Sequence, residues 1–171
     1  MKYRILTICL FTFIACSSPE QKLISDIKTL EANKSLATSD TLINSYVRFA
    51  NQYPQHPNSA RYLFKAAAAS VMAKRQGEGA RLYEQIANTY KDSTAYVSEC
   101  LLRAGYNYMA LNDPANEKRV FEQFLKQFPD HAQAEAVRRS IMLIGLSPQQ
   151  QDSLYMLWIK EKNPDLDINL Q

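Results

Sequence analysis

The sequence predicts an all-α protein, an α-solenoid of about three to three and a half helical hairpins followed by a C-terminal capping helix. Apolar residues recur at helical spacing almost throughout, and only 4 of the 171 residues are glycine. The breaks between these segments are short, so successive helices should pack as antiparallel pairs. One phrase also recurs, as FANQYPQHPNSA at 49–60, IANTYKDSTAYV at 86–97 and FLKQFPDHAQAEA at 124–136. Its starts lie 37 and 38 residues apart, a period typical of helical repeats.

Residues 1–15 have the pattern of a secretory signal. Lys2 and Arg4 precede an apolar run from Ile5 to Ala15, which is shorter than the roughly 20 residues that a membrane-spanning helix needs. The stretch FIAC resembles a bacterial lipobox, in which a small residue precedes the cysteine that is acylated. We therefore expect a lipoprotein signal peptide and lipidation of Cys16. The alternative is an ordinary signal peptide, cut near Ala15, with Cys16 incidental.

Residues 16–22 are expected to form a lipid-proximal tether, and apolar stripes place the helices that follow. The stripes are Leu23, Ile27 and Leu30; Ile43, Tyr46, Phe49, Ala50 and Tyr53; Leu63, Phe64, Ala67 and Val71; Ala80, Tyr83, Ile86, Ala87 and Tyr90; Val97, Cys100, Leu101, Ala104 and Tyr108; Val120, Phe121, Phe124, Leu125 and Phe128; and Ala134, Val137, Ile141 and Ile144. Pro54 and Pro57 interrupt the helical pattern, because proline is excluded from helix interiors. The segment KRQGEG at 74–79 is interpreted as a turn.

The last helix is expected over residues 146–163, with a loose tail at 164–171. Ser147 and Gln150 form the pattern of a capping box. Leu154 and Trp158 are four residues apart on one stripe, so the helix should pack on the helix that begins near Ala132 and cap the last repeat. The alternative is that it docks a partner, because tryptophan is a common interface anchor.

The positions of aromatic, small and proline residues over 23–145 resemble those of the tetratricopeptide repeat family. The matching aromatics are Tyr46, Tyr83 and Phe121 within the second helix of each hairpin and Tyr53, Tyr90 and Phe128 at its end, followed by Pro54 and Pro129; the small positions of the first helices are Ala67 and Ala104. Lys91 stands where the second proline would be, and Met142 and Glu117 replace small residues. The echoed phrase then marks the turns between stacked hairpins.

The resemblance implies a peptide-binding groove on the concave face of the solenoid. The residues that it places there are Phe64, Ala68, Val71, Met72, Leu101, Gly105, Tyr108 and Met109. An apolar groove bearing methionine and tyrosine would suit an extended or helical peptide. The alternative is that these side chains pack inside the solenoid or under the last helix.

The turn phrases and the acylated cysteine are also similar to the outer-membrane assembly lipoproteins of the YfiO or BamD type, although those carry about five repeats. This resemblance implies a lipid-anchored scaffold of the outer membrane, facing the periplasm, that binds other envelope proteins. Its alternative is a structural lipoprotein that self-associates or spaces the layers of the envelope.

Composition and motifs argue against other classes of protein. Lys2 and Arg4 are two of the 20 basic residues, which leaves 18 against 17 acidic residues after residue 15, so no basic footprint for nucleic acid is present. His56 and His131 recur at equivalent turns without further metal ligands nearby. Cys100 lies in an apolar stripe and is interpreted as a small buried hydrophobe. We expect no enzymatic activity, no metal, no cofactor and no small-molecule substrate.

Overall fold

The computed structural model describes residues 18–91 and 94–165. In chain order the elements are α1 (Pro19–Ala32), the 3-10 turn η1 (Lys34–Leu36), α2 (Asp40–Gln52), α3 (Ser59–Met72), α4 (Gln76–Thr89), α5 (Thr94–Ala110), α6 (Pro114–Gln127), α7 (Ala134–Leu143) and α8 (Pro148–Lys162). The described residues contain no strand. The predicted all-α class is confirmed.

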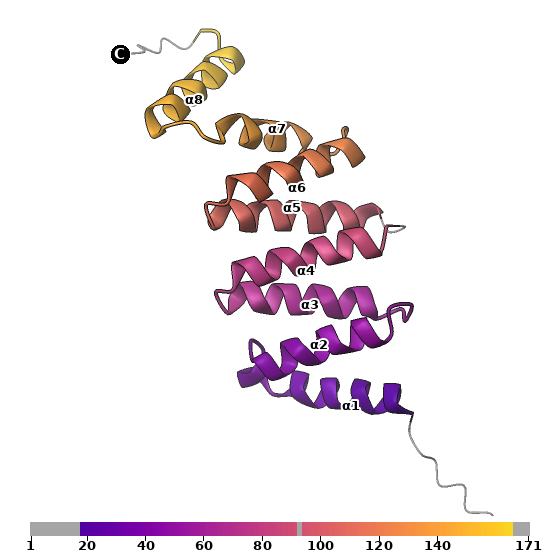
Figure 1. Ribbon diagram of the computed structural model, residues 1–171. Helices are drawn as coiled ribbons and strands as arrows, with labels where there is room; N and C mark the ends of the chain where they lie inside the picture. Colours follow the sequence, from indigo (N-terminus) through magenta and orange to yellow (C-terminus); the bar gives the residue numbers. More distant parts are fainter. Residues whose placement is uncertain (1–17, 92–93, 166–171) are drawn as a thin grey trace, which may run out of the picture.

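The helices form a stack in which, from α1 to α7, each packs against its neighbours in sequence (Figure 1). Three antiparallel hairpins, α1–α2, α3–α4 and α5–α6, are followed by α7, which begins a fourth. The stack is held by one continuous apolar core, whose largest fully buried side chains include Phe49, Tyr83, Phe121 and Phe124. The predicted α-solenoid is therefore present, and its aromatics supply the contacts between repeats.

The start of α1 differs from the expectation of a tether over residues 16–22. The helix begins at Pro19, because Ser18 forms a capping box with Gln21. The Ser18 hydroxyl accepts from the backbone N–H of Gln21 at 3.2 Å, and the Gln21 side chain accepts from the backbone N–H of Ser18 at 3.3 Å. Four of the seven residues assigned to the tether thus belong to the helix. The signal segment and Cys16 lie outside the described residues.

The turn between α3 and α4 is shorter than the segment 74–79 predicted for it. Lys74 closes the turn with a left-handed φ of 65°, and α4 already begins at Gln76. Gly79 is inside the helix, where a Cβ would lie 3.0 Å from the carbonyl oxygen of Ala67 and closer still to Cγ2 of Val71. This glycine therefore serves the close approach of two helices rather than a turn.

The recurring phrase marks the turns α2–α3 and α6–α7, where two histidines occupy the same environment. Nδ1 of His56 and of His131 accepts from the backbone N–H two residues later, at 3.0 and 3.1 Å. The rings pack edge-on against Phe49 and Phe124, with centroids 5.0 and 5.2 Å apart. Both histidines are structural turn residues, as predicted. The phrase recurs because each hairpin must be joined to the next at the same angle.

The position of Cys100 confirms its interpretation as a small buried hydrophobe. It is fully buried in the core, and burial raises the pKa of its thiol to about 12. No described helix is both long enough and apolar enough to cross a membrane.

Helix α8 is present where it was predicted, but it covers α7 only in part. It turns away from the stack at its yellow end (Figure 1), and none of its residues is buried. Its contact with α7 includes Trp158, whose ring lies 5.1 Å from Cζ of Arg139. Tyr155, Leu157 and Ile159 remain 42–52% exposed. The expected cap is therefore incomplete, because six consecutive apolar residues at 154–159 surround the helix and cannot all face α7.

Candidate protein-binding surface

Three of the eight residues predicted to line a groove are instead buried in the core. Leu101 is fully buried, and Gly105 lies beneath the ring of Phe121. Tyr108 is 7% exposed and donates its hydroxyl hydrogen to Oε1 of Glu84 at 2.6 Å. Burial and this hydrogen bond raise the pKa of Tyr108 to about 12. The alternative reading, that such side chains pack inside the solenoid, holds for these three.

The other five predicted residues are accessible in part, and neither the pocket between inter-repeat turns nor the C-terminal cavity, both described below, is lined by more than one of them. Phe64 packs against Tyr83 and Tyr96, with ring centroids 5.3 and 5.2 Å away. Ala68 and Val71 are half-buried. The exposed members, Met72 and Met109, stand near the last turns of α3 and α5, beside the hairpin loops.

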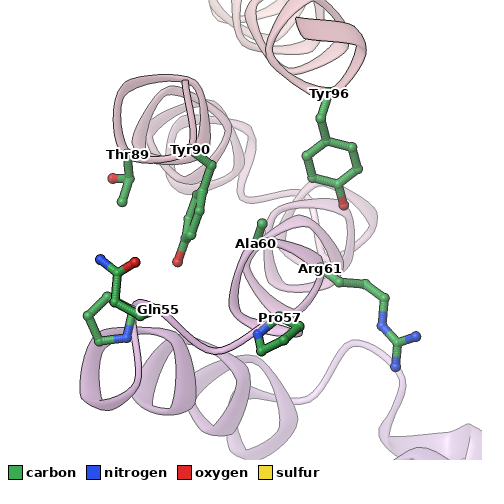
Figure 2. Close-up of a pocket in the computed structure, with 8 residues that line it drawn as sticks. Gln55, Pro57, Ala60, Arg61, Thr89, Tyr90 and Tyr96 are labelled. Atoms are coloured by element: carbon green, nitrogen blue, oxygen red, sulfur yellow. The ribbon is translucent and has the colours of Figure 1, made fainter. Parts of the chain in front are cut away.

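An open pocket of about 660 Å³ lies instead between two successive inter-repeat turns (Figure 2). The residues that line it are Pro54, Gln55, Pro57, Ala60, Arg61, Thr89, Tyr90 and Tyr96. They come from the α2–α3 turn, the start of α3, the end of α4 and the start of α5. Tyr90 and Tyr96 point toward the α2–α3 turn on either side of Ala60. We call this the inter-turn pocket.

The inter-turn pocket presents aromatic faces and hydrogen-bond donors. Burial raises the pKa of both Tyr90 and Tyr96, so their hydroxyls remain protonated at neutral pH. Arg61 is exposed and has no ion pair with another described residue; its guanidinium lies 5.8 Å from the centroid of Tyr62. Such a lining suits a polypeptide that offers carbonyl or carboxylate oxygens.

The recurring phrase of the sequence marks this pocket, although the repetition alone predicts only turns. All of its lining residues except Arg61 come from the first two copies of the recurring phrase, at 49–60 and 86–97. Two structurally equivalent turns lie one above the other in a solenoid, so their side chains face one another across the gap between repeats. The recurring phrase predicted the turns, but the pocket forms only when the hairpins stack.

Polar contacts between repeats hold these surfaces in place. Gln85 donates to Asn51 at 3.2 Å, and Gln123 donates to Asn88 at 3.3 Å, so the same pair links α2 to α4 and α4 to α6. Glu84 accepts two hydrogen bonds from Arg119, at 2.7 and 3.0 Å, in addition to that from Tyr108. The surface is therefore preorganised by the scaffold.

A second polar cluster ties the first hairpin to the second. Glu31 accepts from Lys65 at 2.6 Å and from Tyr46 at 2.8 Å. Burial alone would raise the pKa of Glu31, but these hydrogen bonds and the charge of Lys65 lower it below its usual value. Among the described residues, no group of three or more His, Cys, Asp or Glu side chains is placed to hold a metal ion.

Comparison with known proteins identifies the repeat. Residues 99–131, which comprise most of α5, all of α6 and the turn after it, match the tetratricopeptide repeat family. No curated protein and no solved structure matches the chain. The chain thus contains a tetratricopeptide repeat within an all-helical stack, an arrangement that typically serves to bind other proteins.

Proposed function

We propose that this protein is a non-catalytic scaffold of the cell envelope, anchored through acyl groups on Cys16, which binds another envelope protein through its repeats. The observation that carries the binding role is the inter-turn pocket between two stacked hairpins of a repeat fold. Arg61 and Tyr96 line it and are held by backbone that the repeat contacts fix. An outer-membrane location, with the solenoid facing the periplasm, is part of the proposal.

The anchor is supported by the sequence alone: two basic residues, an apolar run and the stretch FIAC ending at Cys16. Participation in outer-membrane protein assembly is a narrower proposal. It is supported by the resemblance of the turn phrases and of the acylated cysteine to assembly lipoproteins. Replacement of Cys16 by Ala tests the anchor, since the variant should leave the membrane fraction. A variant that still sediments with membranes after a salt wash contradicts it.

The binding role is tested by placing a photo-crosslinking phenylalanine analogue at single positions of the full chain in intact cells. At Tyr96, in the inter-turn pocket, we expect a crosslink to one envelope protein that recurs between preparations. At Lys126, an exposed position of α6 that does not line the pocket, we expect none to that protein. The absence of any specific crosslink at Tyr96, or the same product at both positions, overturns the proposal.

A second candidate function is favoured by α8. Its exposed Tyr155, Leu157 and Ile159, with Met142 of α7, leave an apolar end to the solenoid that a second copy could cover. The protein would then be a structural lipoprotein that self-associates or spaces envelope layers. Crosslinks that join only copies of this chain support this alternative.

A further inference from the structure

A cavity of about 490 Å³ lies where the α5–α6 turn, the end of α7 and the start of α8 meet. It is distinct from the inter-turn pocket, with which it shares no lining residue. Met109, Leu143 and Tyr155 contribute apolar surface to its wall, and Gln151 contributes an amide. Glu117 lines it as well, and we call it the Glu117 cavity. It occupies the end of the solenoid that α8 leaves incompletely covered.

Glu117 has a largely buried side chain whose carboxylate has no partner among the described residues. It is 7% exposed, and its carboxylate makes no hydrogen bond or ion pair with any described residue. The two cations beside it in sequence are engaged elsewhere, Lys118 with Glu122 at 3.9 Å and Arg119 with Glu84 at 2.7 Å. Burial of a carboxylate is costly unless a partner or water compensates for it. No described side chain or backbone group pairs with the carboxylate of Glu117, whose oxygens are not among the fully enclosed unpartnered atoms and so remain accessible to water.

Packing does not require an acidic residue at this position. In the preceding hairpin the equivalent residue, 38 positions earlier, is Gly79, where Val71 and the backbone of Ala67 leave no room for a side chain. At Glu117 the corresponding space opens into the cavity instead. A small or apolar residue would satisfy the helix contact, so packing between the helices does not account for the charge.

We propose that the Glu117 cavity receives a cationic side chain, lysine or arginine, of a partner protein. The ammonium or guanidinium group pairs with the carboxylate of Glu117, while its aliphatic stem lies against Met109, Leu143 and Tyr155. A partially buried, otherwise unpartnered charge gives such a pair selectivity for a cation over a neutral group of the same size. This inference rests on the proposed protein-binding function and adds the chemistry of one contact to it.

The charges around the cavity support a cation as the occupant. Of the residues that line it, Glu117 is the only carboxylate, and none is basic. On α7, Arg139 is paired with Glu135 at 3.1 Å, and on α8, Asp152 is exposed and does not line the cavity. Burial raises the pKa of the Glu117 carboxyl, so a cation should bind more tightly as pH rises and this carboxyl ionises. Reciprocally, the bound cation should lower that pKa.

The test is a carbon-13 NMR titration of the purified full chain with Nα-acetyl-lysine N-methylamide as the probe. The neutral control is the norleucine analogue, which keeps the aliphatic stem and lacks the ammonium group. We expect the lysine probe to lower the pKa of Glu117 and to shift the Met109 methyl resonance saturably, and the norleucine analogue to do neither. The corresponding arginine analogue should behave like the lysine probe.

Two variants show whether the carboxylate of Glu117 is responsible for the response of the Met109 methyl resonance. E117Q should lose the Met109 response, whereas E122Q, which alters an exposed glutamate of the same helix, should keep it. Equal responses to the lysine and norleucine probes, no response at all, or a response that survives in E117Q each overturn the inference. The crosslinking experiment probes the inter-turn pocket, whereas this titration probes the Glu117 cavity. The failure of one can therefore be distinguished from the failure of the other.

Discussion

Phe121 of α6 lies directly against the backbone of Gly105 of α5, so that the glycine provides the space for the aromatic ring. A Cβ at position 105 would be 2.8 Å from Cζ of Phe121 and nearer still to Cδ1 and Cε1. Phe121 is fully buried, which leaves its ring no free direction in which to move. The resemblance to the repeat family placed the small position of this helix at Ala104. Ala104 is also buried, but the closest approach is one residue later.

Replacement of Gly105 by Ala should therefore destabilise the protein by about 1–3 kcal/mol, because it overpacks a filled contact. The matched control is Gly77→Ala, where a Cβ would meet Leu111 and Arg81 at the ordinary distances of 3.6 and 3.7 Å. The control should leave stability unchanged or raise it by at most about 1 kcal/mol, since alanine favours helix over glycine. Urea unfolding of both variants measures the difference, and equal midpoints would contradict the contact.

Replacement of Glu84 by Ala should cost about 1–3 kcal/mol, because it removes the acceptor shared by Tyr108 and Arg119. The Glu84 side chain is 13% exposed, so water compensates little for the loss. The control is Glu99→Ala, which breaks the ion pair between Glu99 and Arg103. Both side chains of this pair are 45–47% exposed. That change should cost less than about 1 kcal/mol. Thermal unfolding that ranks the control as the more harmful would refute the role of Glu84.

Glu117→Gln should stabilise the protein at neutral pH. Burial raises the pKa of Glu117 in the folded state, so the unfolded chain ionises this carboxyl at lower pH than the folded protein does. The folded state therefore holds more protons between the two pKa values, and stability falls as pH rises through that window. The substitution removes this loss, and its benefit should vanish below the ordinary glutamate pKa.

The pH dependence of Glu117→Gln is measured by urea unfolding from acid to neutral pH. Glu122→Gln serves as the control and should change stability by less than about 0.5 kcal/mol, as at most exposed positions. A stability difference between wild type and Glu117→Gln that does not change with pH would contradict the raised pKa of Glu117.

The fluorescence of Trp158 should show that α8 covers α7 only in part. It is the chain's single tryptophan and is half-buried against Arg139, with the ring of Tyr155 edge-on at 5.4 Å. Its acrylamide quenching should lie between that of a buried and of a free indole. Arg139→Ala should shift the emission to the red without lowering the unfolding temperature of the stack. Quenching equal to that of free tryptophan would mean that α8 makes no stable contact with α7.

The helices could be predicted because each buries one stripe, and a stripe is visible in the sequence. The turn at 74–79 was placed wrongly because Gly77 and Gly79 look like turn residues, whereas Gly79 is selected by a neighbouring helix. Local composition does not distinguish these two reasons for glycine.

The groove could not be placed from the sequence, because a helical residue changes its direction by about 100° at each step. Helix α5 has 17 residues and α3 has 14, so counting a fixed repeat length from α3 does not reach the equivalent residue of α5. A residue placed on the concave face by such counting can therefore point into the core. Leu101, Gly105 and Tyr108 were misplaced in this way. The inter-turn pocket and the Glu117 cavity depend on stacking between segments distant in sequence, and no single stripe encodes them.

The capping box at Ser18 would determine how far the solenoid lies from the proposed anchor on Cys16. One residue separates Cys16 from Ser18 in the sequence, and an extended chain spans at most about 3.6 Å per residue, so an acyl group on Cys16 would be attached no more than roughly 7 Å along the chain from the helix cap. An anchor on Cys16 would hold α1 against the lipid headgroups, restrict the tilt of the whole stack, and confine any protein that it binds to the layer next to the membrane.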